Sequence, residues 1–594
     1  MKLNTLYRVL KHVHNKNFTS CVRRYSDISS SKSFALSLFD GKVDCTQIFP
    51  FPKVLSKEQE ENLQQMIPPI VKFFEEVNNP AKNDELETIE PKSMQCLKDL
   101  GAFGLQVPEE YGGIGLNNTQ YARLVEIVGT YDMGVGIALG AHQSIGFKGI
   151  LLYGTKEQKA KYLPSLASGK KIAAYCLTEP SAGSDAQAIQ AKADKSADGS
   201  HYILNGSKLW ISNGGIGEIF TVFAKTMGDD SKTKITAFIV DREFGGISHS
   251  PPEKKMGIKC SNTAALFFEN CKIPAENVLG GEGNGFKVAM NILNNGRFGM
   301  AAGLSGTMRS CIKKAVVHAM ERVTFKTKII EYAMVQEKLA TMALKQYITE
   351  SMAFAISGNM DRKVQDFQVE AAISKVYASE AAWYCVDEAI QILGGMGYMK
   401  ECGLEKTMRD MRIFRIFEGS NDILRLFLVA QGMIHLGKKY KNNNLLQNVF
   451  SGLSSSFTYG YNKKQLIKSV HPELRNSAKL LALRISLFGL AANQMLRKHR
   501  KDIINQQLIL KSLADEVMMI YGISVALSRA SMAMENSEPS ASYQCTLVKF
   551  ALSNVRRYVT DLNLVDIHYN ETIKSIAEHL VQSEGVVQQN PLGF

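Results

Sequence analysis

The sequence predicts a mainly α protein with a β domain in its middle. Apolar residues recur at helical spacing across residues 55–170, and again in three long segments after Gly285. Between them, short β-branched and aromatic runs such as KITAFIVDR and ALFFENCKI are typical of strands. A chain of 594 residues is also too long for one hydrophobic core, so two to four domains are expected.

The first helical region contains EENLQQMIPPIVKFFEEV and QYARLVEIVGTYD, with Pro and Gly between them in VPEEYGG. In the β region, Asn205-Gly206 stands between two strand-like runs. Both residues of this pair accept positive φ, so we expect a hairpin turn there. The three long segments after Gly285 suit a helical bundle, and the last of them stops at Gly394-Gly395. Further helices are expected at 472–500, 503–535 and 543–582.

The net charge of +13 is unevenly distributed. The first 26 residues contain six basic residues and no acid before Asp27, which is typical of a mitochondrial transit peptide. A disordered basic arm is the alternative. A second block from Lys438 to Lys501 has 13 Lys and Arg against one acid, Glu473. Nucleic acid, an anionic membrane surface and a solvated linker are all compatible with such a block.

Several classes of protein are disfavoured by what the sequence lacks. No window holds 18 uninterrupted apolar residues, so no transmembrane helix is expected. The ten cysteines form no CxxC pair and no cluster with His at metal spacing, which indicates reduced thiols and no metal site. There is no phosphate-binding GxxxxGK[ST] loop and no HExxH motif.

Two segments of the β domain could contact a cofactor. In YCLTEPSAGSDA, residues 175–186, a turn of small residues could direct backbone N–H groups at a phosphate or an electron-rich ring. An ordinary surface turn is the alternative, and the pattern alone favours it. Trp210, in KLWISNGG, could stack on a planar ring, or could be a core residue.

Glu418 is the candidate general base. It lies in RIFRIFEGSNDILRLF, and apolar neighbours such as Phe414 and Phe417 would strip water from its carboxylate and raise its pKa. Gly419 would let a substrate approach closely. The alternative is an acid placed at a helix N-terminus for its dipole, together with Asp422.

Six motifs, in this order and spacing, make the chain resemble the acyl-CoA dehydrogenase family. They are YCLTEPSAGSD, KLWISNGG, LNNGRFGMAA, RVTF, QILGGMGY and IFEGSNDILRLF. The extra C-terminal region and the ending EGVVQQNPLGF make it most similar to the very-long-chain branch. The resemblance implies a family fold with a central β-barrel, an extra C-terminal helical domain, and FAD between barrel and bundle. The implied divisions are a transit peptide and arm (1–35), an N-terminal helical domain (36–174), the β-barrel (175–285), the helical bundle with the base (286–432), a basic membrane-surface linker (433–471) and the C-terminal helical domain (472–594).

The resemblance also implies a role for each matching residue. Glu418 would remove the α-proton of a long-chain acyl-CoA while a hydride leaves the β-carbon, giving a trans-2-enoyl-CoA. Other positions match contacts to cofactor or substrate. Those that match FAD contacts are Tyr175, Leu177, Thr178, Ser184, Trp210, Ser212, Ser420 and Asp422, together with Arg322, Phe325 and Gln336, which would reach the FAD of a neighbouring subunit, and Gln391, Gly394 and Gly395 over the adenosine half. Those that match substrate contacts are Ser184, Asn294, Arg297, Gly419, Gly136 and Gly140.

The chain differs from other members of the family at several positions. Lys326 stands where Gly commonly follows the Phe of Arg-x-x-Phe, close to the expected subunit contact. Gly136 and Gly140 stand where medium-chain relatives carry larger side chains at the pocket floor, so a deeper pocket is expected. Each extra methylene buried there stabilises binding by about 0.8 kcal/mol. Helix packing is the alternative role of these two glycines.

The resemblance finally implies partners and a location. The basic block would rest on the anionic matrix face of the mitochondrial inner membrane, and no nucleic-acid partner is expected. The C-terminal domain would limit assembly to a homodimer, and electrons would pass to electron-transfer flavoprotein. Two alternatives are an acyl-CoA oxidase and a non-enzymatic factor for respiratory complex I assembly.

Overall fold

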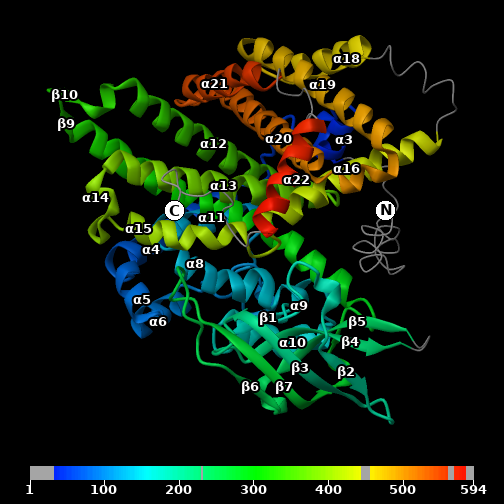
Figure 1. Ribbon diagram of the computed structural model, residues 1–594. Coiled ribbons are helices and arrows are strands. Elements are labelled where there is room, and N and C mark those ends of the chain that lie inside the picture. Colours follow the sequence, from blue (N-terminus) through cyan, green and yellow to red (C-terminus); the bar gives the residue numbers. More distant parts are fainter. Residues whose placement is uncertain (1–32, 229–231, 443–454, 560–566, 583–594) are drawn as a thin grey trace.

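The computed structural model describes residues 33–228, 232–442, 455–559 and 567–582. As predicted, the protein is rich in helices and has one central sheet. Figure 1 shows the sheet at one end of the molecule, with the long helices of the bundle and of the C-terminal region at the other. Residues 1–32, which make up most of the expected transit peptide and arm, lie outside the described residues.

The N-terminal region folds into helices, as the apolar spacing predicted. Three of them begin at capping boxes, in which Ser56, Asn117 or Thr155 exchanges hydrogen bonds with a Gln three residues later. The helices are α3 (Phe34–Phe39), α4 (Lys57–Glu76), α5 (Pro80–Leu86), α6 (Pro91–Asp99), α7 (Asn118–Tyr131), α8 (Met133–Gly140), the π-helical turn η4 (Ala141–Gly146), α9 (Lys148–Tyr153) and α10 (Lys156–Ala167).

The β domain is a single eight-stranded sheet with the order β6-β7-β3-β2-β4-β5-β8, and β1 pairs with β4. The expected barrel is wrong in one respect: β6 and β8 do not pair with each other, so the sheet is not closed. The strands are β1 (Ala173–Cys176), β2 (Lys192–Lys195), β3 (His201–Ser212), β4 (Ile219–Met227), β5 (Thr233–Asp241), β6 (Ile247–His249), β7 (Thr263–Pro274) and β8 (Val278–Leu279).

The hairpin predicted at Asn205-Gly206 is also wrong. The pair lies inside β3, where the register against β7 shifts between Leu204 and Gly206. Gly206 has φ 143°, and a Cβ there would lie 2.7 Å from Ala191, so the sequence signal marks a bulge and a close backbone approach. The chain turns instead between β2 and β3, at a segment that contains Gly199 with φ 71°.

Three long helices form the bundle, as expected from their length. The first, α11, approaches α7 very closely: a Cβ on Gly129 of α7 would lie 2.0 Å from the carbonyl oxygen of Gly303. Only glycine permits this contact, which fixes α7 beside the centre of the bundle. The elements are α11 (Gly285–Glu321), β9 (Val323–Thr324), β10 (Thr327–Lys328), α12 (Ala333–Asp361), α13 (Gln368–Leu393), α14 (Gly395–Tyr398), α15 (Leu404–Met411), η10 (Arg412–Arg415) and α16 (Asn421–Asn442).

The C-terminal domain is helical, and its core includes residues from the start of the chain. Phe34 and Phe39 of α3 are buried against Tyr521 and Phe488. Residues 33–35, which were assigned to the arm, are therefore buried and begin a helix. The helices are α18 (Ser455–Lys468), which falls within the expected linker, α19 (Arg475–His499), η13 (Arg500–Asn505), α20 (Gln507–Glu535), α21 (Ala541–Val559) and α22 (Ile567–Gln582).

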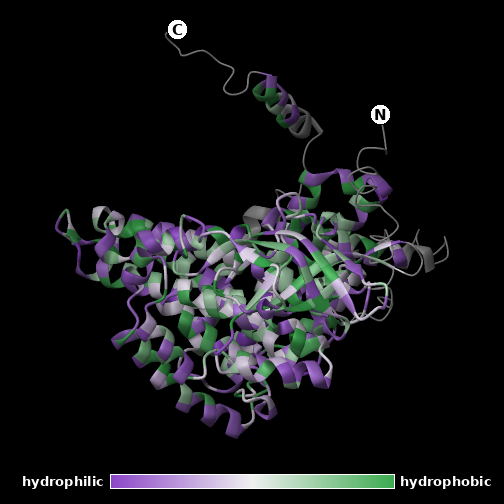
Figure 2. Ribbon diagram, turned by 90° about the horizontal axis from the view of Figure 1, so that it is seen from below, coloured by the Kyte–Doolittle hydropathy of each residue, from purple (hydrophilic) through white to green (hydrophobic). Residues whose placement is uncertain are grey.

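Two stretches of the described chain are long and apolar enough to cross a membrane, although none was expected: Met133–Tyr153 and Gln507–Glu535. Their most apolar windows are 56% and 78% buried inside the protein, as core helices are. By contrast, α22 stands apart from the body of the molecule in Figure 2, and its residues 572–582 are exposed.

Candidate active site

Glu418 lies in a tight loop between η10 and α16. Glu418 and Gly419 both have positive φ, 52° and 96°, so the backbone is held in an unusual conformation. Lys375 of α13 anchors this loop from behind, since its Nζ donates hydrogen bonds to the Gly419 carbonyl (2.7 Å) and to Asn421 Oδ1 (3.0 Å). Burial lowers the pKa of Lys375 to about 7. A loop fixed in this way can hold a carboxylate in one orientation.

One oxygen of the Glu418 carboxylate has no hydrogen-bond partner among the described residues. This atom, Oε2, is buried. Burial raises the pKa of this carboxyl, and the charges of Arg297 and Lys375 oppose the shift. The apolar surroundings that the sequence indicated therefore have the predicted effect on the pKa. A buried carboxylate with a raised pKa and a free oxygen is suited to accept a proton.

Arg297 and Asn294 lie next to this loop on α11. The Arg297 guanidinium donates to Asn294 Oδ1 (2.6 Å) and, through Nη2, to the Glu418 carbonyl oxygen (3.4 Å). Its Nε is buried and has no partner among the described residues. A Cβ on Gly296 would lie 3.8 Å from Glu418 Oε2, so the glycine keeps the space beside the carboxylate open.

Trp210 is not a core residue. It lies where β3 bulges away from β7, between Lys208 and Ile211, and its own φ is 55°. Because a bulge redirects a side chain, the indole is 63% exposed although it belongs to a central strand. The indole also lines the large cavity described below. Its exposed face favours stacking on a planar ring, one of the two roles that the sequence left open.

The turn at 175–186 is also not an ordinary surface turn. Glu179 is buried within it and forms an ion pair with Lys208 of β3 (2.7 Å), and it accepts a hydrogen bond from the Ala191 amide (3.1 Å). Lys208 also donates to the Leu177 carbonyl (3.3 Å). The turn is thus tied to the strand that carries Trp210, which places both beside the same cavity.

One cavity of about 2990 Å³ joins these parts. A pocket for one drug-sized ligand is roughly 300–1,000 Å³, so this space suits two long ligands. The exposed indole, the open carboxylate oxygen and the unpartnered Arg297 Nε fit a bound FAD with a substrate beside it. The predicted residues that line the cavity are Gly136, Gly140, Tyr175, Leu177, Thr178, Ser184, Trp210, Ser212, Asn294, Arg297, Glu418, Gly419 and Ser420.

The remaining predicted contacts lie outside this cavity. Asp422 is exposed in the first turn of α16, where Ser420 Oγ accepts a hydrogen bond from the Ile423 amide (3.4 Å). The others lie at one end of the bundle, which we call the bundle tip. It comprises the C-terminal ends of α11 and α13, the β9–β10 hairpin, the start of α12 and residues 394–399. Phe325 there is 89% exposed. The exposed predicted residues of the tip are Arg322, Phe325, Gln336, Gln391, Gly394 and Gly395.

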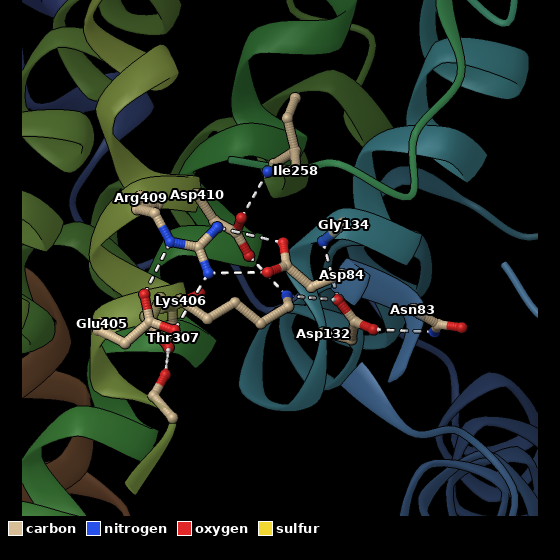
Figure 3. A network of polar contacts seen from close by, with 12 residues as sticks. Asn83, Asp84, Asp132, Gly134, Ile258, Thr307, Glu405, Lys406, Arg409 and Asp410 are labelled. Carbon is tan, nitrogen blue, oxygen red and sulfur yellow. Dashed lines mark hydrogen bonds and ion pairs between the residues drawn. The ribbon is translucent and has the colours of Figure 1, made fainter. Parts of the chain in front are cut away.

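A partly buried network of charged side chains, shown in Figure 3, includes one residue of the cavity lining. Arg409 of α15 pairs with Asp84 of α5 (2.8 Å), and Lys406 pairs with Asp410 (2.7 Å) and with Asp132 at the start of α8 (3.4 Å). Arg409 also lines the cavity. The network therefore holds the N-terminal helices against the bundle at the site.

Neither Lys375 nor this network was predicted from the sequence. A signal for Lys375 existed, because it is the one charged residue in the mostly small or apolar run AAISKVYAS. Its partners follow it by more than 40 residues, however, and no local pattern connects them.

Comparison with known proteins bears on this site directly. The chain matches the family models described as the N-terminal (57–170), middle (174–271) and C-terminal (283–433) domains of acyl-CoA dehydrogenase, and ACAD9/ACADV, C-terminal domain (472–586). It is 54% identical to the mitochondrial very long-chain specific acyl-CoA dehydrogenase of Bos taurus and 53% identical to that of Homo sapiens. Each alignment covers 95% of this chain and 90% of the relative.

A solved structure extends the likeness to the fold. The acyl-CoA dehydrogenase of Bacillus anthracis, complexed with FAD, superposes with a TM-score of 0.76 at 32% identity. The match covers 91% of this chain and 94% of that one, and thus includes the C-terminal domain. The protein is therefore an enzyme of the acyl-CoA dehydrogenase family, with FAD as its cofactor and an acyl-CoA as its substrate.

Proposed function

We propose that this enzyme dehydrogenates long- and very-long-chain acyl-CoA to trans-2-enoyl-CoA, with Glu418 as the base. One observation carries the proposal: the Glu418 carboxylate is buried in the cavity with an unpartnered oxygen and a raised pKa. The raised pKa matters because a base is most effective when its pKa lies near the working pH.

Each group of the site has a distinct task in this proposal. FAD, when bound beside Trp210 and Ser212, supplies the acceptor for the hydrogen that leaves the β-carbon as hydride. Glu418 takes the proton from the α-carbon. The Glu418 backbone N–H polarises the thioester carbonyl, which acidifies that α-proton. Arg297 and Lys375 hold the loop from two sides, so neither the carboxylate nor the N–H needs to reorganise during the reaction.

The preference for long chains rests on Gly140. A Cβ built on this residue would meet no atom within 4 Å, so the glycine does not serve helix packing. It faces the cavity, and a side chain there would fill the space that a long acyl chain needs. Gly136 is less clear-cut: its Cβ would lie 3.3 Å from Val128 Cγ1 and 3.4 Å from Met133 Sδ. The very long-chain specificity in the names of the relatives agrees with this assignment.

The test is anaerobic flavin reduction by acyl-CoA thioesters of increasing length. We expect reduction by palmitoyl-CoA and longer substrates. In Gly140→Leu the preference should move to shorter chains, because the side chain occupies the far end of the pocket. An unchanged preference in this variant would reject the pocket assignment. No reduction by any acyl-CoA in the FAD-loaded wild type would reject dehydrogenation and favour the alternative role in complex I assembly.

The bundle tip supports a homodimer. Apart from Phe325, several large apolar residues are exposed there, which is unusual for a monomer surface. We propose that a second copy covers this patch and that the tip residues reach the FAD of that copy. Sedimentation of the FAD-loaded enzyme would measure the dimer. The exposed apolar residues are Met320, Val323, Phe325, Met334, Met396, Tyr398 and Met399.

The basic region supports contact with the matrix face of the mitochondrial inner membrane, and the electron acceptor would be electron-transfer flavoprotein. Part of that region, 443–454, lies outside the described residues. In α18, Lys464 and Lys468 are exposed. Each basic residue near an anionic surface contributes about 1 kcal/mol. Replacing Lys463, Lys464 and Lys468 by Gln should release the protein from anionic liposomes and leave its activity in detergent unchanged. Undiminished binding would contradict the membrane contact.

A further inference from the structure

The two helices α7 and α8, which both line the cavity, meet at a single residue. α7 ends at Tyr131 and α8 begins at Met133, and Asp132 between them has an extended backbone (φ −151°, ψ 101°). Val128 of α7 and Gly136 of α8 face each other across this joint, since a Cβ on Gly136 would lie 3.3 Å from Val128 Cγ1. The angle at Asp132 therefore decides how much room the cavity offers along both helices.

The helix α8 cannot hold its direction alone. It has eight residues, MGVGIALG, and three of them are glycines. Glycine is a poor helix former, and a helix this short is not stable by itself in water. Packing of Val135 and Leu139 against the N-terminal helices holds the outer side of α8, whereas the end that joins α7 is held by the side chain of Asp132.

Both carboxylate oxygens of Asp132 are used at this joint. Oδ1 accepts a hydrogen bond from the Gly134 amide (3.0 Å), which caps α8, and Oδ2 accepts one from Asn78 Nδ2 (3.1 Å). The Lys406 ammonium of α15 lies 3.4 Å from Oδ1. The Asp132 side chain is fully buried, so its charge needs this partner, because an uncompensated buried charge is strongly destabilising.

Lys406 connects the joint to the bundle and to the sheet domain (Figure 3). Its Nζ also pairs with Asp410 Oδ2 (2.7 Å), and Asp410 Oδ1 accepts a hydrogen bond from the Ile258 amide (2.5 Å). Ile258 lines the cavity and has a positive φ of 45°. Removal of the ammonium would leave the buried carboxylates of Asp132 and Asp410 close together with no cation between them. Their repulsion would displace the start of α8.

We propose that Lys406 is a positioning residue for the length of the acyl chain: its ion pair with Asp132 fixes the angle between α7 and α8 and keeps the far part of the acyl pocket open. Neither Lys406 nor Asp132 lines the cavity, so both act on the substrate through α8. The reacting carbons lie at Glu418, and an acyl chain meets α8 only when it is long enough to reach Gly136 and Gly140. The inference rests on the proposed dehydrogenation of long-chain acyl-CoA.

The test compares a very long substrate, behenoyl-CoA, with a short one, decanoyl-CoA, in anaerobic flavin reduction at low substrate concentration. In Lys406→Met we expect the ratio of the two second-order rate constants, behenoyl over decanoyl, to fall about tenfold. This is the effect of leaving two methylenes of the long chain unburied. The constant for decanoyl-CoA should not change. An equal fall for both substrates, or no fall for either, would overturn the inference.

Two control variants separate positioning from a general loss of stability. Lys406→Arg keeps the charge and should retain most of the wild-type ratio. Lys171→Met removes a lysine from another ion pair, with Asp241 (3.0 Å), and neither of these residues lines the cavity. Its melting temperature should fall while the ratio stays unchanged. If Lys171→Met lowers the ratio as much as Lys406→Met does, the effect is one of stability alone. FAD content is measured for each protein.

A second substitution keeps the test decisive if Lys406→Met does not fold. Asp132→Asn removes the other charge of the pair but keeps an oxygen that can cap α8. It should lower the ratio about fourfold, the effect of one methylene. The double variant should be no worse than Lys406→Met, since it leaves no unpaired charge at position 132. An unchanged ratio in Asp132→Asn, or effects that multiply in the double variant, would contradict the role of the ion pair.

The two proposals can fail separately. If wild-type flavin is reduced by neither thioester, dehydrogenation itself is rejected. If Gly140→Leu shifts the preference to shorter chains and Lys406→Met leaves the ratio unchanged, only the role of Lys406 is rejected.

Discussion

The cavity around Glu418 and the bundle tip both carry residues that match FAD contacts, yet the two regions are built differently. Around Glu418, side chains from α11, α13, β3 and the loop before α16 meet within one chain, and buried hydrogen bonds fix them. At the tip, the matching residues are exposed and Phe325 contacts almost nothing. The first region is complete in one subunit, whereas in the proposed homodimer the second would acquire its partners only on assembly. Substitutions in the two regions should therefore impair different properties of the enzyme.

The largest effect is expected for Glu418→Gln. Gln keeps the shape of the side chain but cannot accept the proton, so the rate of flavin reduction by palmitoyl-CoA should fall by about 10⁴-fold, the upper end for a lost general base. FAD should stay bound and the dimer should persist. Stopped-flow absorbance under anaerobic conditions measures the rate. A variant that bleaches at the wild-type rate would remove Glu418 from its role.

Lys375→Met should lower the rate of flavin reduction by about 100-fold, since a loop displaced by about 1 Å has an effect of this size. The pH profile separates positioning from a general loss of structure. The Lys375 charge opposes the raised pKa of Glu418, so its removal raises that pKa further. Activity needs the deprotonated carboxylate, and the acidic limb of the kcat/KM profile should move to higher pH.

Lys375→Arg keeps the charge and is the control. An acidic limb that stays in place in Lys375→Met would mean that Lys375 acts only through packing.

Phe325→Asp tests the other region. An exposed charge in place of a central apolar contact should weaken dimerisation and FAD retention about 30-fold, the equivalent of a 2 kcal/mol hot spot. The residual flavin should still be reduced by palmitoyl-CoA at a near-normal rate. Met227→Asp, at another exposed apolar residue in the sheet domain, should have neither effect. If FAD occupancy and mass are unchanged in Phe325→Asp, the tip has no share in the cofactor site.

Lys326→Gly should have the smallest effect. Phe325 and Lys326 form a two-residue turn between β9 and β10, with φ 49° and 65°. Two positive φ values favour glycine, which explains why the family commonly has Gly at the second position. The substitution should increase the free energy of unfolding by about 1 kcal/mol. Denaturant unfolding would reveal it, and destabilisation would show that the Lys326 side chain makes a contact across the subunit boundary.

Patterns local in sequence predicted most of the fold. The long helices of the bundle and of the C-terminal domain follow from apolar spacing. The raised pKa of Glu418 agrees with the burial that its apolar sequence neighbours indicated. Contacts between segments distant in the sequence could not be predicted in this way. Asn205-Gly206 looks like a hairpin turn, but its backbone must pass close to Ala191 inside a strand. The role of Trp210 was undecided because it depends on a bulge that only pairing with β7 creates.

The α3 segment has a consequence for how the chain reaches its native state. Phe34 and Phe39 complete a core that also includes Phe488 and Tyr521, which come about 450 to 490 residues later. A polypeptide made or imported from its N-terminus first must carry these two aromatic rings uncovered until nearly the whole length is present. Contacts so distant along the chain slow folding and favour aggregation of intermediates. The enzyme should therefore depend on a chaperone more than relatives whose chains end with α16.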